Sequence, residues 1–199
     1  MSSSTFIALL RGINVGGRNT VPMAELRSLA SGLGWMDVRT YIQSGNVVFR
    51  MARSSEAATE PGTEIEAGSV AALEAELERA IGSHFGFSVP VIVRSAAAWS
   101  GHLAANPFPD ASAVEPNLVM LALSKAPLRE GVVDELREHA TNGERIHLAG
   151  DALWIHYVGG VGRSKISPGL LDRIVGSPVT TRNWRTAVKL AEMAGVAAR

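Results

Sequence analysis

Three segments of the sequence place basic side chains beside glycines or helix-capping residues. They read RGINVGGRN (residues 11–19), GGVGRSK (159–165) and TTRNWR (180–185), and each is expected to precede a helix. Backbone N–H groups at the start of a helix attract phosphate or carboxylate, and arginine and lysine add positive charge. The sequence therefore predicts a binding module for a small anionic, phosphate-bearing ligand. The candidate contacts, with two more from a turn at residues 44–46, are Arg11, Asn14, Gly16, Gly17, Arg18, Asn19, Ser44, Asn46, Arg163, Ser164, Lys165, Arg182, Asn183 and Arg185.

Gly12 and Gly17 have the G-x-x-x-x-G spacing of a nucleotide-binding P-loop, but the two residues that follow do not fit. A P-loop continues with lysine, which reaches the terminal phosphates, and with serine or threonine, which binds magnesium. Arg18 and Asn19 occupy those positions here, and asparagine is a poorer magnesium ligand. A β-to-α turn, in which the glycines adopt positive φ and Asn14 bonds locally, is the plainer interpretation. A turn that also holds an anion stays open.

The second basic segment, residues 159–165, poses the same choice. Its plain interpretation is a flexible loop in which Ser164 is a helix cap and the charges of Arg163 and Lys165 are solvated. Its alternative interpretation is a second contact for the anionic ligand.

The third segment contains a local electrostatic conflict. Thr181 or Asn183 is expected to cap the backbone N–H groups of the last helix, with Trp184 as a core anchor. Arg182 and Arg185 then lie near the positive end of the helix dipole, which disfavours cations unless an acid or an anionic ligand is close. This conflict is the strongest single indication of a ligand.

Ser44 and Asn46 lie in the segment QSGN, where a short turn is expected between the apolar segments VRTYIQ and NVVFR. A nucleophilic serine needs a base and an oxyanion hole, usually in a G-x-S-x-G elbow, and neither partner is evident. Both are more simply turn residues, although Gln43 and Asn46 could offer amide contacts to a ligand. No general base can be named, so whether the protein is an enzyme stays open, and no cofactor is expected.

Thiol and metal chemistry find little support in the sequence. The chain has no cysteine, which excludes disulfides and thiolate catalysis. His147 and His156 are expected on facing strands of one hairpin, but half-exposed sheet residues are the plainer interpretation. No metal site is predicted.

The elements that must position these side chains repeat one order. In the first half, hydrophobic periodicity predicts strands near residues 5–12, 38–43, 46–50 and 89–95, and helices near 22–34, 70–81 and 96–105. Residues 52–68 are small, polar and acidic, and we expect a flexible loop there, with Ser69 as the cap of the next helix. In the second half, the same patterns predict a strand at 117–124, a helix near 128–140, a hairpin over 144–158 that turns at Gly150-Asp151, a helix near 170–175, a short strand at 178–181 and a last helix carrying Trp184.

The order β-α-β-β-α-β in each half predicts an α+β protein of two tandem ferredoxin-like halves with antiparallel sheets. We expect the first half at residues 1–110. The second half is expected at residues 111–199 and includes the C-terminal helix.

The charge balance bears on the partners. The 19 basic and 19 acidic residues cancel, which argues against a general electrostatic attraction to nucleic acid. Nucleic-acid binding stays an alternative, because Tyr41, Phe49 and Trp154 lie on predicted strands, where aromatic rings can stack on bases. A protein-interaction domain with open sheet faces is the third possibility, and the oligomeric state is not predicted. No apolar run approaches the ~18 residues of a membrane span, so we expect a cytoplasmic protein.

Several of these segments together resemble a known bacterial family. The segments are ALLRGINVGGRN, MAELR, YIQSGNVVF, NPF, GRSK and TTRNWRTAVKLAEMA, and they occur in order between about Phe6 and Met193. The chain resembles the family called domain of unknown function 1697. It departs from that family in the acidic stretch before Ser69, which looks like an insertion, and in Pro168, inside a segment that the family reads as helix. The resemblance implies a two-part α+β fold and implies that the polar motifs matter, but it supplies no substrate, cofactor or catalytic residue.

Overall fold

The computed structural model describes residues 3–52 and 64–197, with side chains given from residue 70 onward in the second range. The chain forms two compact units. Unit 1 comprises Met1–Trp99 together with Met193–Val196, and unit 2 comprises Ser100–Glu192 together with Ala197–Arg199. In the described part of the chain, no helix is both long enough and apolar enough to cross a lipid bilayer.

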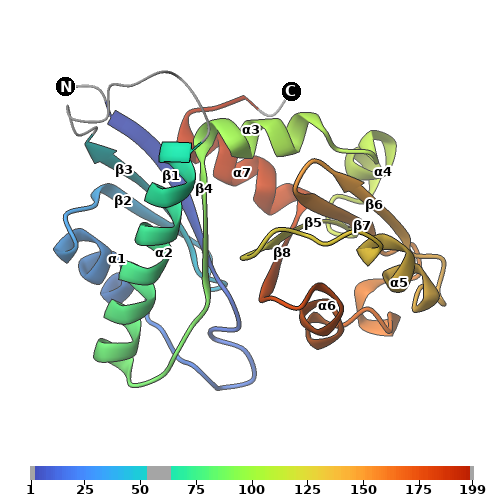
Figure 1. The fold of residues 1–199 in the computed structure, drawn as a ribbon, viewed down its shortest axis with the longest axis horizontal. Helices are drawn as coiled ribbons and strands as arrows, with labels where there is room; N and C mark the ends of the chain where they lie inside the picture. Colours follow the sequence, from blue (N-terminus) through green and yellow to red (C-terminus); the bar gives the residue numbers. More distant parts are fainter. Residues whose placement is uncertain (1–2, 53–63, 198–199) are drawn as a thin grey trace. The chain divides into compact units, whose positions relative to one another are not determined.

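Unit 1 contains a four-stranded antiparallel sheet with two helices on one face (Figure 1). The strands lie in the order β2-β3-β1-β4. The bounds of the elements are β1 (Ser3–Leu10), α1 (Met23–Gly32), β2 (Met36–Tyr41), β3 (Asn46–Ala52), α2 (Glu64–Phe85) and β4 (Val91–Ser95), and α3 (Ala96–Ala104) follows β4 directly.

Alternate residues of the unit 1 strands face the two helices, because successive side chains of a strand point to opposite faces. Phe6, Ala8 and Leu10 of β1 belong to this core, with Phe49 of β3 stacked on Trp35 at a ring-centroid distance of 3.7 Å. The helices contribute the fully buried Leu26, Ala30, Leu77 and Ile81. The buried Leu10 fixes the end of β1, from which the first glycine segment leaves.

Unit 2 repeats this arrangement with a second four-stranded antiparallel sheet, in the order β6-β7-β5-β8 (Figure 1). Its core packs Ala122 and Leu153 of the sheet against Leu136 of α5 and Leu171 of α6. The bounds of the elements are α4 (Pro109–Val114), β5 (Val119–Ser124), α5 (Val132–Glu138), β6 (Arg145–Ala149), β7 (Ala152–His156), the 3-10 turn η1 (Val161–Arg163), α6 (Pro168–Val175), β8 (Val179–Asn183) and α7 (Trp184–Ala194).

The structure confirms an α+β protein with two antiparallel sheets, and it differs from the sequence prediction at four places. α2 begins at Glu64, before Ser69, so the end of the segment predicted as a flexible loop is helical, while residues 53–63 lie outside the described residues. Pro168 opens α6 without disturbing it, because Ser167 caps that helix by accepting from the Leu170 N–H. The strand predicted at 178–181 extends to Asn183. The chain passes from unit 1 to unit 2 between Trp99 and Ser100 instead of near residue 110.

Three connections between these elements carry most of the predicted contacts. The first loop is residues 11–22, between β1 and α1. The hairpin turn is residues 42–45, between β2 and β3. The second loop is residues 157–167, between β7 and α6.

Candidate functional site

The first loop is a small β-ribbon and does not have the form of a P-loop. Val15 and Arg18 form an isolated antiparallel bridge, and Gly16 and Gly17 turn the chain between them with φ values of 58° and 74°. The helix α1 begins only at Met23. A P-loop helix begins within its glycine motif and points its free N–H groups at the phosphates. The P-loop interpretation is therefore excluded by the backbone as well as by the sequence.

Asn14 anchors the first loop to the rest of unit 1. Its Nδ2 donates to the carbonyl of Val21 at 3.0 Å and to the carbonyl of Gln43 at 2.8 Å. Its Oδ1 accepts from the Val21 N–H at 2.9 Å. Asn19 adds a bond from Nδ2 to the Gly12 carbonyl at 3.1 Å. The amide of Asn14 is thus used within the protein, and its predicted role as a ligand contact becomes a positioning role.

The hairpin turn is packed tightly beneath the first loop. Gly45 has a φ of +74°, and a Cβ built on it would lie 2.6 Å from the Cβ of Leu10 and 2.7 Å from Cδ1 of Ile13. Asn46 is fully buried, and its Nδ2 donates to the Tyr41 carbonyl at 2.9 Å and to Ser44 Oγ at 3.0 Å. Ser44 and Asn46 therefore hold the turn together, as the plainer interpretation of the sequence expects.

The first loop presents cationic and apolar side chains outward. Arg18 is exposed, Arg11 is half-buried, and Val15 is 68% exposed. Gly16 and Gly17 are exposed as well, and their N–H groups have no acceptor among the described residues. Neither the first loop nor the hairpin turn contains an aspartate or glutamate. The two connections therefore carry basic residues and no acidic residue of their own.

The second loop is anchored by a carboxylate. Ser164 donates its hydroxyl to Glu144 Oε1, and the Asn142 N–H donates to Glu144 Oε2 at 2.7 Å. The side chain of Asn142 also donates to the Arg163 carbonyl, and Arg163 Nε donates to the Gly159 carbonyl at 2.8 Å. The hydroxyl proton of Ser164 is thus donated to a carboxylate of the protein itself, in the place of the anionic ligand that the sequence predicts for it.

The electrostatics of the second loop follow from Glu144. Burial alone raises the pKa of Glu144, but the hydrogen bonds from Ser164 and from the N–H groups of Asn142 and Glu144 outweigh it, and the pKa stays below 4.5. Burial, with the charge of Glu144 beside it, raises the pKa of Tyr157 to about 12. The Tyr157 hydroxyl donates to the Ile166 carbonyl at 3.2 Å. Lys165 is exposed beside this negative centre.

Only the end of the third basic segment is a helix start, because residues 180–183 belong to β8 and α7 begins at Trp184. Arg182 lies within β8, is only 7% exposed, and donates from Nη1 to Thr180 Oγ1 at 2.8 Å and to the Thr181 carbonyl at 2.9 Å. Burial lowers the pKa of Arg182 to about 10. Asn183 does cap α7, because its Oδ1 accepts from the Thr186 N–H at 2.9 Å. The predicted conflict with the helix dipole therefore applies only to the exposed Arg185.

The aromatic and histidine residues considered as candidates are mostly buried or bonded within the protein. Phe49 and Trp154 are fully buried, so neither offers a face for base stacking, and Tyr41 is half-buried. His156 pairs in register with Arg145 rather than with His147, and its Nε2 lies 3.2 Å from Glu115 Oε2. These contacts weaken the interpretation as a nucleic-acid platform and show that the two histidines are not directly opposed.

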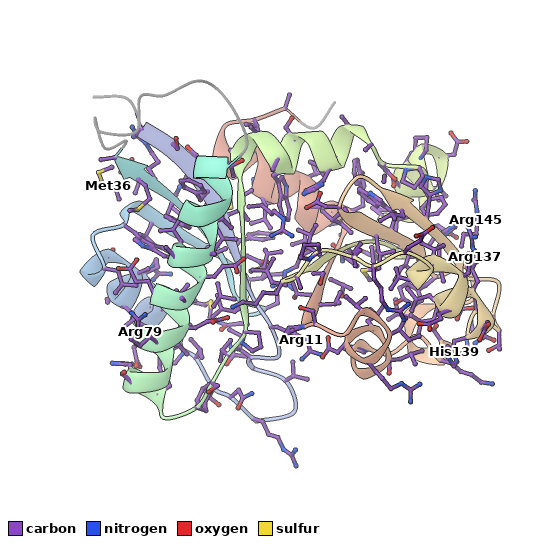
Figure 2. All side chains as sticks on the ribbon, viewed as in Figure 1. Arg11, Met36, Arg79, Arg137, His139 and Arg145 are labelled. Carbon is purple, nitrogen blue, oxygen red and sulfur yellow. The ribbon has the colours of Figure 1, made fainter. Side chains whose placement is uncertain are left out.

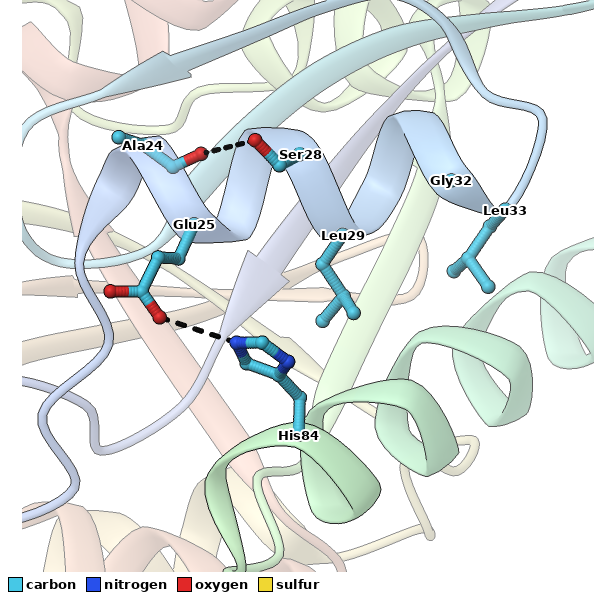
Figure 3. A pocket seen from close by; sticks show the side chains of 7 residues that line it. All are labelled: Ala24, Glu25, Ser28, Leu29, Gly32, Leu33 and His84. Atoms are coloured by element: carbon cyan, nitrogen blue, oxygen red, sulfur yellow. Dashed lines mark hydrogen bonds and ion pairs between the residues drawn. The ribbon is translucent and has the colours of Figure 1, made fainter.

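A groove between α1 and α2 contains none of the predicted site residues (Figure 3). It measures about 760 Å³, and Leu29 and Leu33 contribute its apolar wall. Glu25 and His84 lie across it, with His84 Nε2 3.2 Å from Glu25 Oε2. Both side chains of this ion pair are about half exposed, so the pair is well solvated.

The structure brings together one part of the predicted site. In unit 1, Asn14 joins the first loop to the hairpin turn, so Arg11, Gly16, Gly17, Arg18 and Asn19 lie in one linked pair of loops with Ser44 and Asn46. The predicted residues of unit 2 lie in the second loop, at the end of β8 and in the first turn of α7. Sequence reasoning missed Glu144, although it is the one carboxylate in the TNGE segment between α5 and β6, and it missed the exposed Val15 and Ile42.

Comparisons with known proteins agree with this architecture. The solved structure of the conserved bacterial protein SP0830 from Streptococcus pneumoniae is similar to this chain, with a TM-score of 0.69 and 23% sequence identity over 97% of this chain and 99% of that one. At that identity the likeness establishes the fold alone. No curated protein matches this chain. The profile described as "Protein of unknown function (DUF1697)" matches residues 3–154, and the chain therefore belongs to the DUF1697 family.

Proposed function

We propose that this protein binds a small anionic, phosphate-bearing ligand, and that the first loop of unit 1 is the principal contact. Arg18 supplies an exposed guanidinium, which can bind a phosphate through two parallel hydrogen bonds. The exposed N–H groups of Gly16 and Gly17 add two adjacent backbone donors in a turn, and successive N–H groups in a turn can hold an anion. Arg11 contributes further positive charge at the base of the loop.

The observation that carries this proposal is the chemistry of the loop's anchor. Asn14 holds the loop through a neutral amide, so the anchoring bonds add no negative charge beside the exposed Arg18. The second loop has the same combination of glycine and basic residues, but its anchor is the ionised Glu144. An incoming anion is repelled by that carboxylate and meets no such charge in the first loop.

The remaining predicted contacts belong to unit 2. We keep them in the proposal, but we expect them to contribute less to the binding energy than the first loop does. Arg163, Lys165 and Arg185 add charge from exposed positions, whereas Ser164 and Asn183 are already bonded within the protein. We also propose that each unit has the ferredoxin-like arrangement. Its support is the element order β-α-β-β-α-β together with the strand orders β2-β3-β1-β4 and β6-β7-β5-β8.

The test is thermal unfolding of the full chain with a panel of phosphate compounds. A ligand that binds the folded state at a concentration of ~100 times its Kd stabilises that state by about 2.7 kcal/mol, which corresponds to a Tm rise of roughly 5–10 °C. Arg18→Ala removes an exposed side chain and is expected to abolish this rise. Arg79→Ala is the matched control, because Arg79 projects from α2 of the same unit (Figure 2). An equal Tm rise in Arg18→Ala and in the unsubstituted protein would refute the proposed site.

A further inference from the structure

Two exposed apolar side chains stand at the proposed anion site. Val15, in the first loop, is 68% exposed, and Ile42, in the hairpin turn, is 50% exposed. Isolated exposed apolar residues are common on protein surfaces and need no explanation alone. The location of both residues beside the proposed anion site, and the backbone conformation of Ile42, suggest that these two side chains contact a ligand.

The two connections that carry these residues are joined by one hydrogen bond. Asn14 Nδ2 donates to the Gln43 carbonyl at 2.8 Å, and Val15 and Ile42 are the chain neighbours of the two bonded residues. Gly45 packs against Leu10 and Ile13 beneath them, so the two connections cannot move apart without breaking core contacts. A surface held in this way loses little freedom when it binds a ligand.

The backbone of Ile42 is unusual for its residue type. Four non-glycine residues among those described have positive φ, and three of them are the short polar residues Asn14, Asp37 and Asn19 that tolerate this conformation. The fourth is Ile42, with a φ of 47°, and a β-branched side chain is strained there. Strain of this kind persists where the side chain has another role, and here that side chain is exposed.

From these observations we propose that the ligand is an amphiphilic anion, in which an apolar group next to the phosphate packs on Val15 and Ile42 while Arg18 binds the charge. This inference rests on the proposed function and specifies its ligand class. A phosphate monoester of an aryl or branched alkyl group has the required chemistry. Inorganic phosphate has only the charge, so it leaves both apolar side chains in water.

The test compares inorganic phosphate, methyl phosphate, phenyl phosphate and 1-naphthyl phosphate by titration calorimetry on the full chain. We expect phenyl phosphate to bind about 10-fold more tightly than inorganic phosphate, because it covers apolar surface. The double variant Val15→Ser/Ile42→Asn keeps Arg18, and asparagine suits the left-handed backbone at position 42. It is expected to bind inorganic phosphate normally and to lose the gain from the aryl group to within about twofold. Val114→Ser, at an exposed valine of α4, is the control that should keep the gain.

The outcomes separate the two proposals. If inorganic phosphate binds and the aryl group adds nothing, the proposed function stands and the amphiphilic ligand is rejected. A gain that survives in the double variant also rejects it, because the apolar contact then lies elsewhere. If none of the four compounds binds, both proposals fail.

Discussion

The two glycine-containing loops have similar sequences and different anchors. The first loop is joined to the hairpin turn by the side-chain amide of Asn14, whereas the second loop is joined to the segment before β6 by the carboxylate of Glu144. Each anchor satisfies backbone or hydroxyl donors that would otherwise lie unpaired at a loop. The first does so without adding charge, and the second bonds an ionised carboxylate directly to Ser164 of the loop.

This difference shows that glycine and arginine in a loop do not define an anion site. At 4 Å, two unit charges interact by about 4 kcal/mol at an effective dielectric constant of 20. A carboxylate bonded to a loop can therefore cancel much of the attraction that a nearby arginine has for an anionic ligand. The anchoring residue therefore decides which of the two loops can attract a phosphate. In the second loop that residue, Glu144, is not part of the glycine-containing segment itself.

The largest expected loss of stability comes from a glycine substitution that compares the packing of the β2–β3 turn with that of the β6–β7 turn. Gly45→Ala places a Cβ against Leu10 and Ile13 and forces alanine to a φ of +74°. Overpacking and the left-handed backbone together are expected to cost about 3 kcal/mol of unfolding free energy. Gly150→Ala, in the β6–β7 turn, has a φ of +61° and no atom within 4 Å of the new Cβ, so about 1 kcal/mol is expected. Urea unfolding measures both, and equal losses would show that the hairpin turn of unit 1 is not held by close packing.

Asn14→Ala tests the neutral anchor directly. It removes three hydrogen bonds and is expected to lower the unfolding free energy by about 2–3 kcal/mol. Asn19→Ala is the matched control, because Asn19 has nearly the same φ but its side chain donates one bond, to Gly12. We expect about 1 kcal/mol there. Urea unfolding of both variants gives the comparison, and a loss in Asn14→Ala no larger than in Asn19→Ala would mean that the first loop is anchored elsewhere.

The fold was accessible from the sequence because its signals are local and repeated. Leu26 and Ala30 of α1 lie four residues apart, and Leu77 belongs to the same kind of apolar repeat in α2. All three are buried, as helical spacing predicts. Gly150-Asp151 marks a two-residue hairpin between two apolar strands, and the structure has that turn. The strand β8 was predicted too short, because Arg182 and Asn183 are polar and read as a helix start. Pairing with Met120 and Leu121 of β5 overrides that local preference.

The candidate site was only partly accessible, because its decisive contacts join residues far apart in the chain. Asn14 bonds to Gln43, and Ser164 bonds to Glu144 from 20 residues away. Sequence spacing identified Asn14 and Ser164 as polar loop residues, but it gave no means of telling which would be used internally. The sequence of a loop does not show whether a carboxylate or an amide anchors it, because only the fold determines which residues come into contact.

Glu144→Gln tests the charged anchor of the second loop. The glutamine keeps the shape and can still accept hydrogen bonds, so we expect a loss of about 1–2 kcal/mol at pH 7 from the missing charge. The folded protein holds the pKa of Glu144 below 4.5, so this contribution is present above pH 4.5 and is lost as the pH falls through the lowered value. Unfolding free energies of the two proteins between pH 3 and 7 should therefore converge at the acid end. A constant difference across that range would show that the ionised carboxylate is not what stabilises the loop.

The smallest expected effect, and the only gain in stability, comes from the backbone of the hairpin turn. In the described part of unit 2, the residues with positive φ are all glycines, whereas unit 1 holds Ile42 at a φ of 47°. Ile42→Asn relieves part of that strain and is expected to raise the unfolding free energy by about 0.5–1 kcal/mol, because asparagine adopts the left-handed region at lower cost. Ile42→Val is the matched control, since valine is also β-branched and keeps the strain. Urea unfolding should show a gain for asparagine and none for valine. If the two variants are equally stable, the isoleucine at this turn carries no strain that a ligand contact needs to explain.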